Sequence, residues 1–423
     1  MPALAPRSQV WSAARPVFIA AMLLFVVTIV VGILNGLDIY EPDHDTLITH
    51  VHAGTLGWIT LAVSGVALLM FTSDRSLTAG EVSQGTALAW SMIGAITLYV
   101  AAFLVGDRMP GDRIQRPIVG TLLFVVVIWF LVWLFRANSA FEHSSIARLG
   151  LLLSWVSLLI GTVFGVVLGI YSSQGEVPGL PDDTAAAVAE AHPPAMVIGF
   201  LILAAMAIME WLLRGDKTWA EAKSGSVQMW LILTSGVLVN VAFLVGKEEE
   251  ILGPANGIMI IGVVILVVRS WKALAPAGWR GAGTGVYPRI STLVLLVYLV
   301  LLTVIVSQVI SGSMDFDALT ETQFGLVLTF DHVMFIGVMT NLLFGSVATS
   351  LRGSTLALVD RILLWGVNLG IVGFAIGLIT VTPWLKRVST PVLGAALLLG
   401  IAMYIADLSK VAEPSVVEAN VTE

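Results

Sequence analysis

The 423-residue sequence has no cysteine and few charged residues. Without cysteine the chain can form no disulfide, thiolate metal site, iron–sulfur cluster or C-x-x-C-H attachment of a c-type haem. Charged residues make up 12% of the chain, against about 25% in soluble proteins. The net charge of −7 offers no basic patch for nucleic acid. Any bound metal would therefore need His, Met or carboxylate ligands.

Apolar residues make up 57% of the chain. A helix needs about 20 of them to cross the ~30 Å hydrocarbon layer of a membrane. We predict a single integral membrane domain over residues 1–423, surrounded by lipid. The first apolar run continues without a cleavage signal, so we interpret it as a span rather than a removed signal peptide. The twelve expected spans are 17–35, 47–71, 86–106, 117–137, 147–171, 191–213, 226–246, 252–272, 289–311, 324–350, 359–380 and 388–408.

Lysine and arginine in the loops predict the orientation of these spans. Fifteen of the 21 lie on the side of the N-terminus. By the positive-inside rule, both termini are then cytoplasmic, in a bacterial-type plasma (inner) membrane. Spans 2, 6 and 10 consequently begin at the outer face. The six exceptions, on the outer side, are Arg108, Arg113, Arg116, Lys247, Lys386 and Arg387.

Histidine recurs at regular positions near the outer ends of spans 2, 6 and 10. His52, His192 and His332 are separated by steps of 140 residues. This period predicts three repeats of four helices, approximately 17–138, 146–272 and 289–408. Within them, His52 and His332 stand five residues before a glycine, and His50 and His192 stand seven residues before one. The three glycines are Gly57, Gly199 and Gly337.

These four imidazoles predict a metal or haem centre. An imidazole in lipid is costly unless it has a partner, and a metal that accepts neutral nitrogen supplies one. For any single histidine, a structural hydrogen bond is the alternative. Residues two apart on a helix point ~200° apart, so His50 and His52 face opposite sides. We expect His52 and His332 to be axial ligands of one haem, and His50 to face His192 at a second metal or haem site.

At these residues the chain resembles the haem-copper oxidase subunit I superfamily, and within it the short NnrS-like haem- and copper-containing membrane proteins. Residues 50–58 and 331–337 are similar to the His-x-His-Glu-Met-x-x-Gly pattern of the NnrS-like group, with Ala53 and Val333 in place of Glu. The resemblance covers nearly the whole chain. It implies twelve helices in three arcs of four, with haem ligands on helices 2 and 10 near the outer face.

The resemblance also implies further site residues. His192-Pro193 is similar to the pair that opens the copper-binding helix 6 of the oxidases, which makes copper a second candidate cofactor. Lys386 and Arg387 resemble the basic pair that binds haem propionates, and their place on the outer side fits that role. Trp58 is expected to wall the porphyrin. The second candidates for the propionates are Arg108, Arg113 and Arg116.

Three departures argue against oxidase activity. The oxidases carry a His-His pair on helix 7, and residues 226–246 have none. Met196 stands where many oxidases have a redox tyrosine, and Phe330 stands where helix 10 would carry its second histidine. A site without these groups is not expected to reduce dioxygen to water.

The expected function is that of a membrane protein with a b-type haem near the outer face. It would exchange electrons with a periplasmic or membrane donor, or bind nitric oxide or another diatomic gas. An enzyme of this kind would be an oxidoreductase, and whether the chain turns over a substrate is left open. The alternatives are a cofactor-free scaffold and a secondary transporter, although transporters are commonly built from two inverted halves rather than three repeats.

Other polar and sulfur groups have simpler interpretations. Met196 and Met334 can ligate soft Cu(I), although methionine more often fills gaps in a core. Glu210 is expected to form an i,i+4 ion pair with Arg214. The acidic segment 41–45, which contains His44, is expected to be a solvated outer loop rather than a capture site for copper or zinc.

Overall fold

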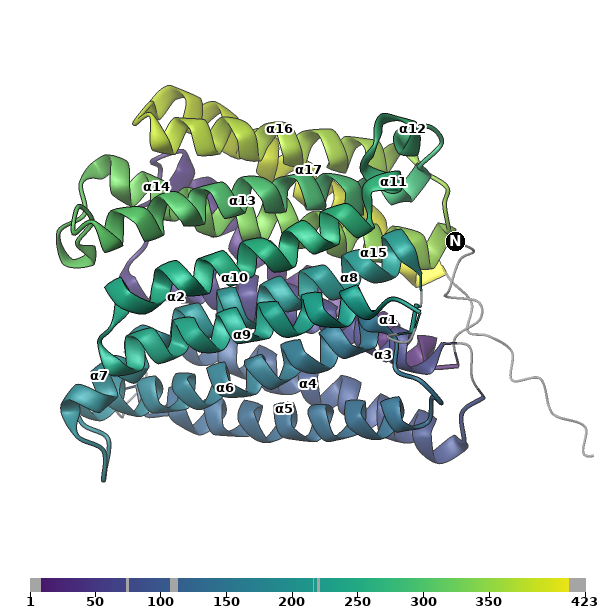
Figure 1. Cartoon of the computed structure of the whole chain (residues 1–423), viewed down its shortest axis with the longest axis horizontal. Helices are drawn as coiled ribbons and strands as arrows, with labels where there is room; N and C mark the ends of the chain where they lie inside the picture. The colour runs from purple at the N-terminus through teal and green to yellow at the C-terminus, as the bar shows by residue number, and fades with distance from the viewer. Residues whose placement is uncertain (1–8, 74–75, 107–112, 216, 219–220, 411–423) are drawn as a thin grey trace, which may run out of the picture.

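The computed structural model describes residues 9–73, 76–106, 113–215, 217–218 and 221–410, which form a bundle of long helices (Figure 1). Within these ranges, twelve helices are long and apolar enough to cross a membrane. The prediction of an all-α, multi-pass membrane protein is therefore confirmed. Nine spans are α1 (Trp11–Gly36), α4 (Ala79–Val105), α5 (Gln115–Ser139), α6 (Ile146–Gln174), α9 (Lys223–Val245), α10 (Glu248–Arg269), α13 (Val286–Ile310), α16 (Leu358–Ile379) and α17 (Pro383–Lys410).

The other three spans are compound helices that contain all four intramembrane histidines. Their parts are α2 (His44–His52), η2 (Ala53–Thr60) and α3 (Leu61–Thr72); α7 (Asp182–Pro194), η4 (Ala195–Leu201) and α8 (Ile202–Arg214); and α14 (Glu321–His332), η7 (Val333–Thr340) and α15 (Asn341–Arg352). The short helices α11 (Trp271–Leu274), α12 (Pro276–Trp279), η5 (Gly283–Gly285) and η6 (Phe316–Ala318) lie outside these compound helices.

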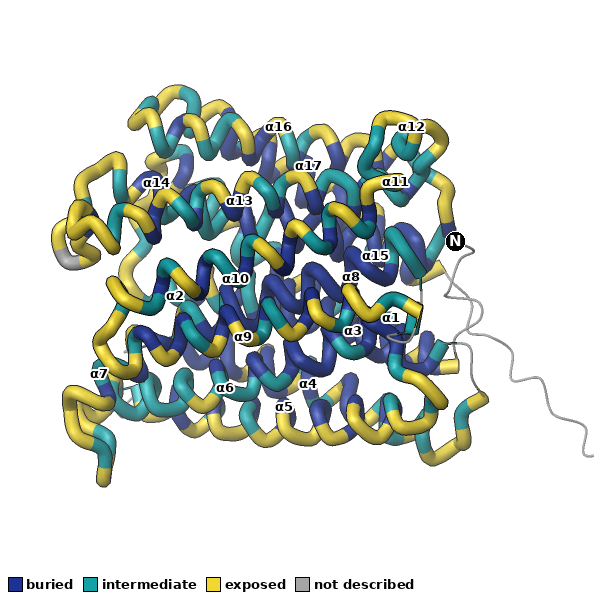
Figure 2. Tube along the Cα trace, in the orientation of Figure 1, coloured by how far each residue is buried: buried dark blue, intermediate teal, exposed yellow. Residues whose placement is uncertain are grey.

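The three compound spans form the centre of the bundle. In their most apolar stretches 89%, 83% and 61% of residues are buried inside the protein, against 33–50% for the other spans described. Figure 2 shows the same contrast, with dark blue tubes for α3, α8 and α15 and yellow outward faces on peripheral helices such as α5 and α16. The spans that carry the histidines are therefore more enclosed by protein than the other spans described.

Each central span contains a π-helical segment at the same register. The segments η2, η4 and η7 each begin four residues before a glycine, and the glycines are Gly57, Gly199 and Gly337. A π-helix has a wider turn than an α-helix; it is rare and frequently occurs at functional sites. In α2 and α14 the segment follows directly after a histidine, at His52 and His332. The widened turns therefore lie beside the residues that the sequence singles out.

Several helices begin earlier than the sequence-based prediction: α1 begins at Trp11 rather than residue 17, and α4 at Ala79 rather than residue 86. Span 6 begins at Asp182 rather than at residue 191, so His192 lies inside the helix instead of opening it. The added turns are alanine-rich, with Asp182 and Asp183 at the positive end of the helix dipole, and hydropathy does not detect such a segment. His44 is also not in a loop, because Asp43 caps α2 by accepting a hydrogen bond from the Thr46 amide at 2.7 Å.

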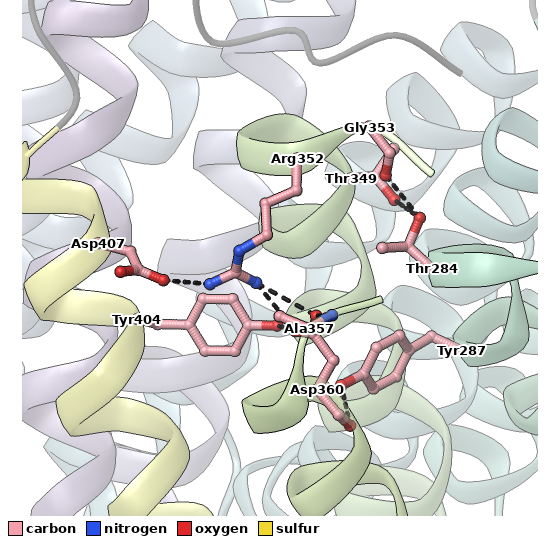
Figure 3. Close-up of polar contacts among 9 residues, drawn as sticks. All are labelled: Thr284, Tyr287, Thr349, Arg352, Gly353, Ala357, Asp360, Tyr404 and Asp407. Carbon is pink, nitrogen blue, oxygen red and sulfur yellow. Dashed lines mark hydrogen bonds and ion pairs between the residues drawn. The ribbon is translucent and has the colours of Figure 1, made fainter. Parts of the chain in front are cut away.

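Buried ion pairs hold the opposite end of the bundle together. Glu210 forms the predicted pair with Arg214 at 3.3 Å, and a closer one with Arg269 at 2.6 Å that the sequence did not indicate. Figure 3 shows a second cluster, around the fully buried Asp360. Its carboxylate accepts hydrogen bonds from Arg352 at 3.0 Å and from the hydroxyl of Tyr404. These contacts tie α15, α16 and α17 together.

Asp360→Ala is expected to destabilise the bundle. It removes one of the two carboxylates that pair with the partly buried Arg352, leaving Asp407, and it removes the acceptor of Tyr404. Loss of a buried acceptor typically costs about 1–3 kcal/mol. Thermal unfolding in detergent should show a clearly lower midpoint. The matched control is Glu250→Gln, because Glu250 is 67% exposed in its pair with Lys247 and such surface pairs add little. Equal midpoints for the two variants would contradict a structural role for the Asp360 cluster.

Candidate functional site

The first histidine-lined cavity lies between α1, α2, η7, α16 and α17. His50 and His332 both line it, together with Trp58 and Phe374. Its volume is about 710 Å³ including the open solvent at its edge, and it shares both histidines with an adjoining hollow of about 1180 Å³, measured in the same way, that reaches Lys386. His50 and His332 therefore line one connected space that extends to a basic side chain.

The second histidine-lined cavity lies on the other side of α2, among α4, α5, α6 and α7. His52 and His192 both line it, with Tyr99, Phe103 and Arg116. Its volume is about 1450 Å³, including the open mouth. His52 stacks on Phe103, with ring centroids 4.3 Å apart and planes 11° from parallel.

The predicted pairing of the histidines is wrong, because the partners are exchanged. His50, not His52, shares a cavity with His332, and His52 shares one with His192. The prediction that His50 and His52 face opposite sides of their helix agrees with this placement. The error lay in assuming that histidines at the same offset from the glycine face each other, whereas each cavity combines one histidine of each offset.

His50 and His192, the pair seven residues before a glycine, are each fixed by the preceding span. Nδ1 of His50 donates to the carbonyl oxygen of Thr28 on α1 at 2.9 Å, and Nδ1 of His192 donates to that of Gly161 on α6 at 2.9 Å. A carbonyl oxygen can only accept, so Nδ1 carries the proton in both rings. Nε2 then has a free lone pair.

His52 and His332, the pair five residues before a glycine, are fixed by their own helix instead. Nδ1 of His52 donates to the carbonyl oxygen of Ile48 at 2.9 Å, and Nδ1 of His332 donates to that of Leu328 at 2.7 Å. Nε2 is again the unprotonated nitrogen. Neutral imidazoles whose second nitrogen is held by a backbone carbonyl are typical metal ligands. The sequence reveals the four histidines but not these acceptors.

Two glycines leave room for the rings. A Cβ built on Gly32 of α1 would lie 3.3 Å from Cε1 of His50, and one built on Gly165 of α6 would lie 3.0 Å from Cε1 of His192. Each glycine follows the carbonyl acceptor of its histidine by four residues, so the imidazole lies over one helical turn. Sequence reasoning missed both glycines, because glycine is common throughout the chain.

Trp58, which the sequence analysis expected to wall a porphyrin, lines the first cavity together with His332. The indole is fully buried and stacks on Phe25, with centroids 5.0 Å apart and planes 4° from parallel. Its Nε1 donates to Oγ1 of Thr340 at 3.0 Å. The ring is thus held rigidly as part of the wall of the cavity.

Each cavity has two cations near its mouth that share one aspartate. At the first, Lys386 and Arg387 each lie 2.7 Å from Asp38. The hydrogen bond from Lys386, followed by the one from Arg387, lowers the pKa of Asp38 below its ordinary value, so the carboxylate is charged at neutral pH. Of the two cations only Lys386 lines the adjoining hollow.

At the second cavity the cations are Arg113 and Arg116, and both line it. Arg116 lies 2.5 Å from Asp45 and Arg113 lies 3.5 Å from it. Asp45, in the first turn of α2, and Asp38, just after α1, were not predicted to hold these cations, since an acidic residue at a helix end carries no distinctive signal. The third candidate, Arg108, lies outside the described residues.

A bare metal ion finds few ligands in these cavities. In the part of the chain that the structure describes, no three His, Asp or Glu side chains form a group that could hold an ion. Met196 lines the second cavity beside its two histidines, whereas Met334 is fully buried and lines neither cavity. Two imidazoles are too few for most ions but match the axial positions of a macrocycle that supplies four nitrogens itself.

Comparison of the sequence with models of known protein families finds no match, and comparison with curated proteins finds none either. The function is therefore inferred from the residues that line the two cavities.

Proposed function

We propose that the chain is an integral membrane haem protein that holds a b-type haem between His50 and His332. The observation that supports this most directly is the tautomer of the two imidazoles. Backbone carbonyls hold both Nδ1 protons, so both Nε2 lone pairs remain for an iron atom in the cavity. The cavity is lined mainly by apolar and aromatic groups, which suit a porphyrin.

Bound haem would supply one-electron redox chemistry, or coordination of a diatomic gas if one axial bond opened. The residues of the chain favour electron transfer. His50 is held by α1 and His332 by its own helix, so neither ring moves away from the centre of the cavity without breaking a hydrogen bond. We therefore expect a six-coordinate iron, and slow or no binding of nitric oxide or carbon monoxide. Copper remains the second candidate cofactor.

Lys386 is the residue of the basic pair that would bind a haem propionate. It lines the hollow next to both histidines, whereas Arg387 is 55% exposed and does not line it. A charge-assisted hydrogen bond is about twice as strong as a neutral one. Asp38 holds both cations in place and would exchange with the propionate or share them with it.

Lys386→Ala is expected to weaken haem retention about tenfold, which corresponds to the loss of one charge-assisted hydrogen bond of roughly 1.4 kcal/mol. Haem transfer to an excess of apomyoglobin measures this as a faster rate of loss. Arg387→Ala removes the same charge from the same aspartate but not from the cavity, so it serves as the matched control. Equal rates for the two variants would show that Lys386 does not contact the haem.

We further propose the threefold repeat and the haem-copper oxidase-like architecture. The 140-residue spacing of histidines, the common register of the three π segments and the recurrence of two kinds of imidazole hydrogen bond support it. Under this proposal and the positive-inside rule, the histidines lie near the outer face of a bacterial-type inner membrane, both termini are cytoplasmic, and the electron donor is periplasmic or in the membrane.

The experiment is to purify the full-length protein in detergent from haem-replete cells and to measure its oxidised and reduced absorption spectra, iron, copper and haem. We expect a low-spin b-type spectrum with iron equal to haem. A colourless preparation without iron would overturn the proposal and would leave the transporter and scaffold alternatives.

A further inference from the structure

The second cavity has the same donor set as the first, on the opposite side of α2. Its histidines repeat the two hydrogen-bond types: His52 donates to its own helix, like His332, and His192 donates to the preceding span, like His50. No histidine lines both cavities, and their linings share only Val51 and Thr55 on the helix between them. The second cavity is therefore a separate site with two free Nε2 atoms.

The walls of this cavity suit a flat, apolar ring. His52 stacks on Phe103 and meets Tyr99 edge-on, with centroids 5.6 Å apart. The volume of about 1450 Å³ exceeds what a single ion needs. Gly165 keeps the space beneath His192 open, because any Cβ there would lie 3.0 Å from the ring.

The mouth of the cavity suits negative charge. Arg113 and Arg116 both line it, and the guanidinium of Arg116 lies 4.7 Å from the ring centre of Phe103. The side chain of Arg116 is only 4% exposed, and its Nε is buried without a hydrogen-bond partner. Asp45 pairs with both arginines and offsets one of their two charges, which leaves a net positive charge of one at the mouth. This remaining charge attracts carboxylates and is unfavourable for a copper ion held by His52, His192 and Met196.

We propose that His52 and His192 bind a second haem, whose propionates are held by Arg113 and Arg116. This extends the proposed function, which concerns only the site of His50 and His332. The protein then has two haems on opposite faces of α2, with ligands two residues apart. Electrons can pass between them across one helix.

The same register predicts that there is no third haem. The two remaining offset positions are Pro194, five residues before Gly199, and Phe330, seven residues before Gly337. Neither side chain can ligate iron. Phe330 instead stacks on Tyr298 of the preceding span α13, with centroids 4.5 Å apart. Where His50 and His192 bond to the preceding span, the third repeat has an aromatic contact.

The test is the number of haems per chain, measured by the pyridine haemochrome method and by iron analysis on the full-length protein. We expect two in the wild type, one in His192→Ala, and two in the control His143→Ala, whose histidine lines neither cavity. One haem in the wild type, unchanged in His192→Ala, would overturn the second site but leave the first. One copper that is lost in His192→Ala would also overturn it. A wild type without any haem would contradict both proposals.

A second variant covers the case in which His192→Ala fails to fold. His192→Met keeps a ligand, and histidine–methionine ligation raises the reduction potential of haem. We expect two haems, of which one titrates at a higher potential than in the wild type while the other is unchanged. Unchanged potentials for both would show that His192 is not a ligand.

Discussion

The His332→Ala protein is expected to lose the haem that it would hold with His50. Without the imidazole of His332, a bound haem would keep only His50 as a protein ligand, and the cavity would have additional space for water. Loss of an outer-shell partner alone typically weakens metal binding about 10–100-fold, so loss of the ligand itself is expected to cost at least about 100-fold. His50→Ala should have the same effect, since the two rings line one cavity. The haem content of the purified His332→Ala and His50→Ala proteins measures the two effects.

The effect should be confined to one site. His52 and His192 line a different cavity, so the haem proposed there should survive in His332→Ala with its spectrum unchanged. His143→Ala, between α5 and α6, should keep the full haem content and controls for expression. If His332→Ala removes the haem while His50→Ala retains it, the pairing of these two residues is wrong.

Gly32→Val and Gly165→Val are expected to remove one haem each, although neither variant replaces a ligand residue. A side chain on Gly32 meets His50 and one on Gly165 meets His192, at 3.3 and 3.0 Å for the Cβ alone. The additional methyl groups of valine force the imidazole off its carbonyl acceptor and turn Nε2 away from the cavity. We expect haem loss of the same order as in the histidine variants, and only at the site that each glycine adjoins.

Gly257→Val is the matched control for this pair. Gly257 lies in the membrane span α10, and no atom lies within 4 Å of a Cβ built on it. It tests the general effect of a β-branched residue in a span. Haem contents and thermal midpoints of the three variants should be measured together. Retention of both haems in Gly32→Val and Gly165→Val would contradict the proposed ring positions.

The sequence predicts the spans well because lipid imposes a simple requirement. Every crossing segment must be apolar over about 20 residues, and such runs are easy to detect. The starts of the helices are predicted less well, and span 6 shows the largest difference. Residues 182–190 are helical, but they contain acidic residues and alanine and lie before the hydrophobic run. Hydropathy detects the membrane core of a helix, not its extension beyond the core.

The four histidines are predictable, but their pairing is not. Helical periodicity shows that His50 and His52 point to opposite sides. It does not show which helix lies on each side, because that depends on how the bundle closes. Here α17 packs against α1 and places α14 opposite His50, while α7 lies opposite His52. These contacts join residues far apart in the chain, and no local pattern encodes them.

The groups that orient the imidazoles are invisible in the sequence for a related reason. All four Nδ1 atoms donate to backbone carbonyls, and every residue has one. Asp38 and Asp45, which pair with the cations near the two cavities, lie at helix ends, where acidic residues are common. Only the folded chain distinguishes them.

The central claim is that the Nε2 atoms of His50 and His332 bind one haem iron from opposite sides. A cryo-electron microscopy map of the protein purified from haem-replete cells tests it most directly. We expect the density of a macrocycle between the two rings, with iron bound at both Nε2 atoms and a propionate near Lys386. A map in which lipid or side chains fill this cavity, or in which His50 and His332 bind nothing, would contradict it.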